Sequence, residues 1–443
     1  MLRGVGVLRQ RRHQGEALKR RGSPSKEPKE PKESKESKES KKASFPGSHE
    51  ERVPLLEKRR DAKMSRDAHA YVRGSTARFY EWLASREGRS LPSGPLVWIC
   101  GDAHVGNMGP IARSDGEVAV EIRDLDQTVV GNPVHDLVRL SLSLAMAARS
   151  SDLPGVVTAL LIEELMTGYL EALGGRPPAS TSEESAAVRF VVREANKRSF
   201  RHLHRERLGD SGAMKLRLGE RFWPLSQAER QDVDAFLDRE RIHGLVTLPD
   251  HRDDDAELHV ADAAFWVKGC SSLGLWRCAA LVDIIGAKGR SSFCLLDIKQ
   301  AIAPLAPRAK GSKLPTHFGE RVVEGARALS PVLGHRMVSG TIAGRAVFVR
   351  ELLPQDLKLE LEMLDETEAR ATARALARLL GTAHVRQMDI GHRRAWVKSL
   401  RAATSKSIHA PSWLWQAVID LVAVHERAYL EHCRHHALAQ ARS

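Results

Sequence analysis

The chain has 443 residues, of which 42% are hydrophobic, and it carries a formal net charge of +13. This length and apolar share allow one large or two medium domains with buried cores. The five cysteines are scattered without paired spacing, which excludes a zinc or disulfide framework and indicates a reducing, cytoplasmic compartment, and no apolar run is long enough to span a membrane.

Residues 1–53 form the first expected segment, a basic tail rich in Lys, Glu, Ser and Pro. Its Pro-Lys-Glu and Ser-Lys-Glu repeats hold almost no apolar side chains, so the tail is expected to be disordered. Residues 1–60 contain 18 Lys and Arg against 9 acids, which leaves the rest of the chain nearly balanced. Weak binding to nucleic acid or an anionic surface is therefore expected from the tail alone. The arginine-rich start resembles a transit peptide in composition, although an upstream extension is the preferred explanation.

Two apolar runs in the second expected segment, residues 54–260, lead to acidic residues. The first leads to Asp102, with Asn107 five positions later, and the second leads to Asp124 and Asp126. In phosphoryl transfer one carboxylate orients the acceptor hydroxyl and takes its proton, while an amide and a carboxylate hold the magnesium ions that bridge the nucleotide phosphates. The pattern predicts Asp102 as the base and Asn107, Asp124 and Asp126 as magnesium ligands. The alternative is that these Asp and Asn residues only cap helices and form turns.

The turn sequence Ser-Asp-Gly-Glu at 114–117 separates the two runs. It predicts a hairpin of residues 108–112 and 117–123, which would carry Asn107 near one end and Asp124 at the other. One hairpin would therefore hold both metal ligands together.

Asp136 follows Asp124 by twelve positions, at the start of an expected helix. Aminoglycoside- and choline-type small-molecule kinases have a buried Asp at this offset, and the resemblance implies that Asp136 stiffens the catalytic loop by hydrogen bonds. The passage from Gly101 to Ser143 also resembles the bacterial family known as domain of unknown function 2252, through its Gly-Asp-x-His-x-x-Asn and Asp-x-Asp segments. That family supplies no agreed activity. Its similar Phe-x-Arg-Gly segment makes Arg73 a candidate for contacting a phosphate or a carboxylate, or for pairing with a structural acid.

The rest of the second segment carries fewer signals. Residues 138–149 and 153–173 are expected helices of a larger lobe, and Gly, Pro, Ser and Thr at 174–184 indicate a linker. Residues 185–260 are polar and hold no motif that we can assign, so substrate specificity is expected there.

Residues 261–355 are expected to form a smaller lobe, in the order strand, glycine loop, strand, turn and strand ending in lysine. Small residues let backbone amides approach phosphate oxygens, and the lysine supplies positive charge to the same oxygens. The resembling family usually has glycine at position 271 and glutamate at position 300, where this chain has serine and glutamine. The helix at 318–329 would supply an acid to pair with the lysine, with an ordinary surface ion pair as the alternative. The expected nucleotide-binding residues are Gly269, Ser271, Ser272, Gly274, Lys299 and Glu324, the last as the partner of Lys299.

Residues 356–443 are expected to complete the larger lobe with helices. Residues 377–384 resemble the helix that directly precedes the catalytic loop of small-molecule kinases, although here they lie far downstream of Asp102. The sequence thus predicts an α+β, protein-kinase-like, two-lobed fold with a helix-rich larger lobe. It would be circularly permuted, so that the catalytic loop precedes the glycine loop.

The predicted function is kinase-like: an ATP- and Mg²⁺-dependent phosphotransferase acting on a hydroxyl or amine of an unidentified small-molecule substrate. Two alternatives stay open. A nucleotide-binding pseudokinase or scaffold is favoured by the altered glycine loop. A metal-dependent phosphoester hydrolase would use Asp102, His104, Asp124 and Asp126, but it leaves Lys299 without a role.

Overall fold

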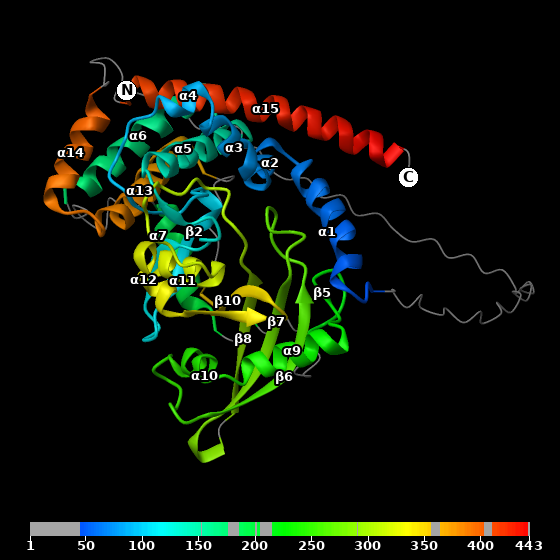
Figure 1. Ribbon diagram of the computed structural model, residues 1–443. Coiled ribbons are helices and arrows are strands. Elements are labelled where there is room, and N and C mark those ends of the chain that lie inside the picture. The colour runs from blue at the N-terminus through cyan, green and yellow to red at the C-terminus, as the bar shows by residue number, and fades with distance from the viewer. Residues whose placement is uncertain are drawn as a thin grey trace, which may run out of the picture. The chain divides into compact units, whose positions relative to one another are not determined.

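The structure is a computed structural model, and it describes residues 45–151, 153–175, 186–199, 202–203, 215–289, 291–355, 364–402 and 410–441. The chain from Phe45 onward forms one compact unit that mixes helices with β-sheets, as the α+β prediction requires (Figure 1). The expected tail lies outside the described residues up to position 44. Its expected end at residue 53 falls inside helix α1 (His49–Met64), which begins where the Ser48 side chain accepts the Glu51 N–H.

A six-stranded antiparallel sheet has the strand order β5-β6-β7-β8-β10-β9. Its apolar side chains pack with those of α9 and α10 in one core. Strand β5 and these two helices precede residue 260, so the boundary expected at that position falls inside this packed group. The elements are β5 (Phe222–Trp223), α9 (Gln227–Leu237), α10 (Glu240–Thr247), β6 (Glu257–Trp266), β7 (Arg277–Ile285), η3 (Ala287–Gly289), β8 (Ser291–Gln300), β9 (Met337–Ile342) and β10 (Arg345–Leu352).

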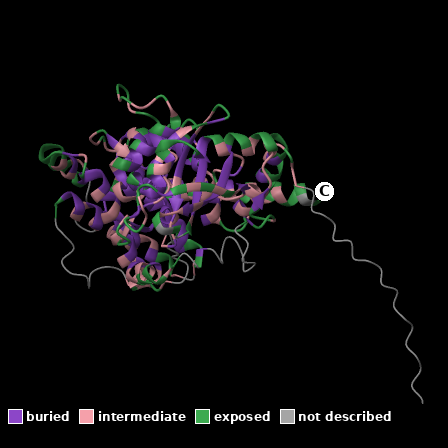
Figure 2. Ribbon diagram, turned by 90° about the horizontal axis from the view of Figure 1, so that it is seen from below, coloured by how far each residue is buried: buried purple, intermediate pink, exposed green. Residues whose placement is uncertain are grey.

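A second core lies among long helices, of which α5 (Val134–Arg149) is buried along nearly its whole length. Helices α6 (Gly155–Leu173) and α13 (Glu366–Val385) pack closely because each presents a glycine: a Cβ on Gly168 would lie 2.1 Å from the Arg374 carbonyl oxygen. Figure 2 shows the buried residues concentrated in the central strands and helices. The remaining helices are α2 (Ala68–Gly74), α3 (Thr76–Leu83), α4 (Arg86–Arg89), α7 (Ala186–Lys197), α11 (Phe318–Leu329), α12 (Pro331–His335), α14 (Ile390–Arg401) and α15 (Ser412–Ala441).

Two short antiparallel sheets hold the acid-bearing segment. The predicted hairpin is confirmed: β2 (Met108–Ala112) pairs with β3 (Val118–Ile122). Strand β1 (Val97–Ile99) pairs with β4 (Val129–Gly131), and the 3₁₀ turn η1 (Val105–Asn107) leads directly into β2. Asp102 follows the end of β1, and Asp124 and Asp126 follow the end of β3.

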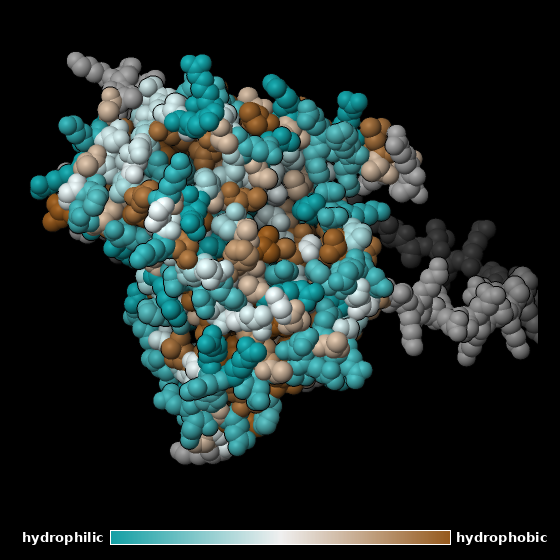
Figure 3. All heavy atoms as spheres, in the orientation of Figure 1, coloured by the Kyte–Doolittle hydropathy of each residue, from teal (hydrophilic) through white to brown (hydrophobic). Residues whose placement is uncertain are grey.

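Polar side chains cover most of the face seen in Figure 3, and apolar ones appear there singly or in small groups. Such scattered apolar exposure is ordinary for a folded protein. No helix in the described ranges combines the length and the apolar character needed to cross a bilayer.

Candidate functional site

The loop of residues 100–107 follows β1, and Asp136 in the first turn of α5 holds it in place. The Asp136 carboxylate accepts hydrogen bonds from the backbone N–H groups of Cys100 (2.6 Å) and Gly101 (2.8 Å). Gly101 adopts φ = +77°, and a Cβ there would lie 2.2 Å from the Gln127 carbonyl oxygen, so only glycine fits this turn. Asp136 therefore makes hydrogen bonds to the 100–107 loop, as expected from the sequence.

A chain of buried polar side chains supports Asp136 from behind. His384, near the end of α13, donates from Nε2 to Asp136 (3.2 Å) and accepts at Nδ1 from the Tyr169 hydroxyl (2.9 Å). Trp396 donates its indole N–H to the Tyr169 oxygen (3.2 Å), and burial raises the pKa of Tyr169. The end of α13 therefore lies directly behind the 100–107 loop, although His384 and Asp136 are 248 residues apart in the chain.

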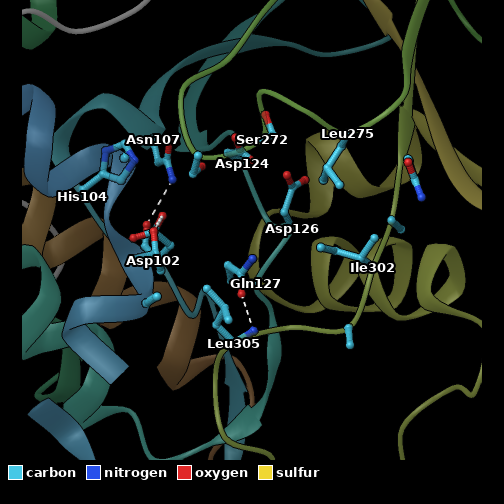
Figure 4. A pocket seen from close by; sticks show the side chains of 17 residues that line it. Asp102, His104, Asn107, Asp124, Asp126, Gln127, Ser272, Leu275, Ile302 and Leu305 are labelled. Atoms are coloured by element: carbon cyan, nitrogen blue, oxygen red, sulfur yellow. Dashed lines mark hydrogen bonds between the residues drawn. The ribbon is translucent and has the colours of Figure 1, made fainter. Parts of the chain in front are cut away.

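Both carboxylate oxygens of Asp102 are occupied. Arg139 donates from Nε to one oxygen (2.8 Å), and the Thr76 hydroxyl donates to the other (2.9 Å). Asn107 donates from Nδ2 to the Asp102 carbonyl oxygen (3.0 Å), which ties the two ends of the loop together (Figure 4). Burial raises the pKa of Asp102, although Arg139 acts in the opposite direction. A fixed carboxylate whose pKa is raised is suited to accept a proton from a neighbouring hydroxyl.

Asp124 and Asp126 lie directly after β3, and Lys299 near the end of β8 reaches them. The Lys299 ammonium contacts the Asp126 carboxylate and lies 3.7 Å from Oδ1 of Asp124. Burial and the Asp124 carboxylate raise the pKa of Asp126 to about 6. Burial acts in the same sense on Asp124, but the neighbouring cations, Lys299 first among them, and a hydrogen bond with Asp126 together outweigh burial and hold the pKa of Asp124 below its usual range. One ammonium thus faces two carboxylates at the end of β3.

Helix α11 lies behind the loop that carries these acids, and it contacts the loop through Arg321. This arginine is 2% exposed and donates hydrogen bonds to the backbone carbonyls of Asp126 (2.8 Å) and Thr128. Gly325, one turn further on, packs against Thr128, because a Cβ there would lie 2.3 Å from the threonine Cγ2. The packing leaves Glu324 exposed. The predicted ion pair between Glu324 and the β8 lysine is therefore wrong, since that lysine contacts the two acids instead.

The loop of residues 267–276 joins β6 to β7 and contains the predicted glycine loop. Gly269 and Gly274 have φ values of +109° and +108°, which residues with a side chain rarely adopt. Ser271 is exposed and Ser272 is half-buried, and both line a cavity that neither glycine lines. The glycines therefore shape this loop, while the two serines face the cavity.

A cavity of about 280 Å³ lies between the 100–107 loop and the 267–276 loop. Its volume is near the lower end of the range of roughly 300–1,000 Å³ that ligand sites occupy. In Figure 4 the 100–107 loop lies on one side of the cavity and Leu275 and Ile302 on the other, with the two acids between them. The predicted site residues that line the cavity are Asp102, Asn107, Asp124, Asp126, Ser271 and Ser272.

The other predicted site residues are placed differently. Lys299 approaches the cavity through its contact with Asp126. Asp136 acts through the backbone of the 100–107 loop. The residues outside the cavity lining are Asp136, Gly269, Gly274, Lys299 and Glu324.

Asp124 and Asp126 carry ligand chemistry suited to magnesium. Oδ1 of Asp126 is buried without a hydrogen-bond partner, and Asn107 lines the same cavity. Magnesium favours one or two carboxylates together with substrate phosphates, so these residues fit the ion. No group of three or more His, Cys, Asp and Glu side chains within the described part of the chain could hold a metal by itself. The metal centre that the hydrolase alternative would build from Asp102, His104 and the two acids is therefore not formed there.

Two buried arginines complete the site, and neither was predicted from a motif. Arg139 is fully buried and interrupts the apolar face of α5, while Arg321 stands three positions before Glu324 on α11. Charged residues are rarely buried unless they are paired. An arginine inside an otherwise apolar helix was therefore the signal that could have identified Arg139.

Comparison with known proteins places the chain in one family. No curated protein and no solved structure matches it. A family model described as "Uncharacterized protein conserved in bacteria" matches residues 52–435. This range includes the six-stranded sheet, the helical core and every residue that lines the cavity. The chain therefore belongs to the DUF2252 family of uncharacterized proteins conserved in bacteria.

Proposed function

We propose that this chain is a kinase-like phosphotransferase, which uses ATP and Mg²⁺ to phosphorylate a hydroxyl or amine group of a small molecule. The observation that carries the proposal is the cluster of Lys299, Asp124 and Asp126. The lysine and Asp126 are 173 residues apart in the chain, yet they meet beside a cavity whose other wall holds Asp102. A base, metal-binding acids and a cation for the phosphates are the groups that phosphoryl transfer requires.

Each residue has a defined task in this proposal. Asp102 accepts the proton of the acceptor hydroxyl, and Arg139 and Thr76 keep its carboxylate from turning. Asn107 and the two acids would hold Mg²⁺, which would neutralise charge on the phosphates. Lys299 would bind phosphate oxygens beside the two acids. The contacts of Asp136 keep the 100–107 loop in one conformation, so that Asp102 does not have to be ordered at each turnover.

The same proposal includes a circularly permuted kinase-like fold with two lobes. Two observations support it. The sheet contains, in chain order, a strand, the 267–276 loop, a strand, and a strand that carries Lys299 near its end, followed by α11. Helix α13 packs against the 100–107 loop through His384, which is the neighbour relation expected of the helix that precedes a catalytic loop. In this chain α13 follows the 100–107 loop in sequence instead of preceding it. The permutation would therefore have removed the direct connection from α13 to that loop.

Isothermal titration calorimetry with ATP and Mg²⁺ tests the proposal. The wild-type chain should bind the nucleotide, and Lys299→Ala and Asp124→Ala should each weaken binding about tenfold or more, because each removes a charged contact. Arg78→Gln on α3 is the matched control, since Arg78 is 45% exposed and pairs with Glu81 on the surface. The proposal would be refuted if wild type did not bind ATP at millimolar concentration, or if the two site variants bound ATP as tightly as wild type.

A nucleotide-binding pseudokinase is the second candidate. Lys299 and Asp126, which nucleotide and metal would need, are in contact with each other. Ser271 stands where the resembling family usually has glycine. Release of ADP in the presence of an acceptor panel separates the two candidates. Turnover that Asp102→Asn abolishes supports the phosphotransferase, whereas binding without turnover supports the pseudokinase.

A further inference from the structure

Basic side chains with buried, unpaired polar atoms gather beside the cavity, and of these His104 lines it. Helix α2 supplies His69 and Arg73, the 100–107 loop supplies His104, and α5 supplies Arg139. The unpaired atoms are His69 Nε2, Arg73 Nε, His104 Nδ1 and Arg139 Nη1. Buried polar atoms are nearly always hydrogen-bonded, because leaving them unpaired costs free energy. Several of them in one place indicate a ligand that pairs with them.

His104 connects this group to the cavity. It is 5% exposed and lines the cavity beside Asp102, and Nδ1 of its imidazole is buried without a hydrogen-bond partner among the described residues (Figure 4). Burial together with Arg139 and Arg73 holds the pKa of His104 well below its usual range. The imidazole is therefore neutral and presents one N–H donor at neutral pH.

Arg73 packs over the backbone beside His104. A Cβ placed on Gly106 would lie 3.2 Å from the guanidinium carbon of Arg73, so the two groups are in contact. The Arg73 side chain forms no ion pair with a described acid, and its Nε is buried without a hydrogen-bond partner, so the structural acid considered as its partner is not found among the described residues. Arg139 is largely neutralised by Asp102, whereas the charge of Arg73 is not neutralised by any described acid.

We infer that Arg73 and His104 form an anion subsite for the phosphoryl acceptor, which would bind a carboxylate or phosphate group of the acceptor next to the hydroxyl that faces Asp102. The inference rests on the proposed phosphotransferase function and names the class of its substrate. The guanidinium of Arg73 can bind either anion through two parallel hydrogen bonds. Cationic acceptors of the aminoglycoside or choline kind would instead meet uncompensated positive charge. The phosphates of the nucleotide belong to the other side of the cavity, where Lys299 lies.

Calorimetry without nucleotide tests the subsite with three probes that differ in charge: inorganic phosphate, glycerate and choline. The full-length wild-type chain should bind at least one of the two anions and not choline. Arg73→Gln should weaken anion binding about tenfold or more, because a charge-assisted contact is lost. The surface variant Arg78→Gln should bind within about twofold of wild type. Tighter binding of glycerate than of phosphate identifies the acceptor anion as a carboxylate, and the reverse order identifies it as a phosphate.

Equal anion binding by Arg73→Gln and wild type overturns the inference, as does binding of choline. Arg73→Lys and His104→Asn provide a second test if Arg73→Gln does not fold. The lysine variant keeps the charge and should recover part of the affinity, whereas the asparagine variant should lose affinity for the anion.

Titration of ATP with Mg²⁺ separates this inference from the proposed function. Arg73→Gln should change the affinity for the nucleotide by less than about twofold, while Lys299→Ala should lose it. If Arg73→Gln lost affinity for ATP and for phosphate to the same extent, Arg73 would be a nucleotide-binding residue, and the inference would be overturned. If the chain binds anions through Arg73 and no ATP at all, the phosphotransferase proposal fails while the anion-binding site stands.

Discussion

The two loops that face the cavity are held in different ways. The 100–107 loop is tied by buried side chains from distant elements: Asp136 accepts two of its N–H groups, and Arg139 and Thr76 hold Asp102. The 267–276 loop is tied by fewer such bonds: Lys63 Nζ donates to the Gly269 carbonyl oxygen (2.9 Å), and at the end of the loop Trp276 donates its backbone N–H to the Gln300 side chain (3.0 Å) and its indole N–H to Glu229 (3.1 Å). Otherwise its course depends on two glycines with positive φ.

This difference matches two tasks. Groups that take part in chemistry must be held in a fixed geometry by surrounding contacts. A loop that covers a ligand can adapt, since regions with few buried contacts open at low free-energy cost. We therefore expect mutations behind the 100–107 loop to destabilise the protein more than mutations within the 267–276 loop, and the latter to act on ligand binding as well. Four predictions test this expectation.

Asp136→Ala should have the largest effect. It leaves the N–H groups of Cys100 and Gly101 buried without an acceptor and removes the partner of His384, so the free energy of unfolding should fall by about 3–5 kcal/mol. Urea unfolding followed by circular dichroism measures it. Asp232→Ala, at an exposed position of α9, should change stability by less than about 0.5 kcal/mol. A loss for Asp136→Ala no larger than this control would contradict the account of the 100–107 loop.

Asp297→Asn tests the anchor at the end of the 267–276 loop. Arg277, the first residue of β7, donates from Nε to Asp297 (2.7 Å), and both side chains are buried. At neutral pH the variant should lose about 2–3 kcal/mol, because the arginine keeps a hydrogen-bond partner but loses its counter-charge.

The same variant has a pH signature. Burial would raise the pKa of Asp297, but its cationic neighbours, Arg277 first among them, together with the hydrogen bond from Arg277 outweigh burial and hold that pKa below its usual range. The stabilisation is therefore complete above the unfolded-state pKa of about 3.9 and is lost as the pH falls below it. Urea unfolding of wild type between neutral pH and pH ~2 should show this loss, and Asp297→Asn should show less of it. Parallel pH curves for the two proteins would count against the ion pair.

Gly274→Ala should have a moderate effect. The added methyl group meets no atom within 4 Å, but the φ of +108° is strained for alanine, so we expect a loss of about 1–2 kcal/mol. Gly244→Ala on α10 is the matched control, because its methyl group also meets no atom within 4 Å and its backbone is helical. That change should be neutral or stabilising. Equal unfolding midpoints for the two variants would show that the 267–276 loop does not need the glycine conformation.

Ser271→Gly should have the smallest effect on stability, within about 0.5 kcal/mol, because Ser271 is exposed and no described hydrogen bond depends on it. Glycine there would let backbone amides approach phosphate oxygens more closely. Titration with ATP and Mg²⁺ should therefore show equal or tighter binding. A marked loss of affinity would mean that the serine hydroxyl itself contacts the nucleotide.

Local sequence signals were reliable where short-range physics dominates. The Ser-Asp-Gly-Glu turn fixed the β2–β3 hairpin, because a tight turn determines the register of the strands that it joins. Helix α11 begins and ends at the predicted residues, since its apolar period is clear. The partner of Lys299 was not predictable in this way. Whether Glu324 reaches Lys299 depends on how α11 is rotated about its axis, and the contact of Gly325 with Thr128 sets that rotation.

The sequence by itself determined the hairpin that carries Asn107 and Asp124, the bounds of α11, and a short set of residues with the chemistry for phosphates and metal. Only the tertiary structure decided which of them meet: Lys299 with Asp126, and Arg73 with the loop that carries His104. The physical reason is that turns and apolar periods act over a few residues, whereas these pairings follow from the packing of elements that lie far apart in the chain.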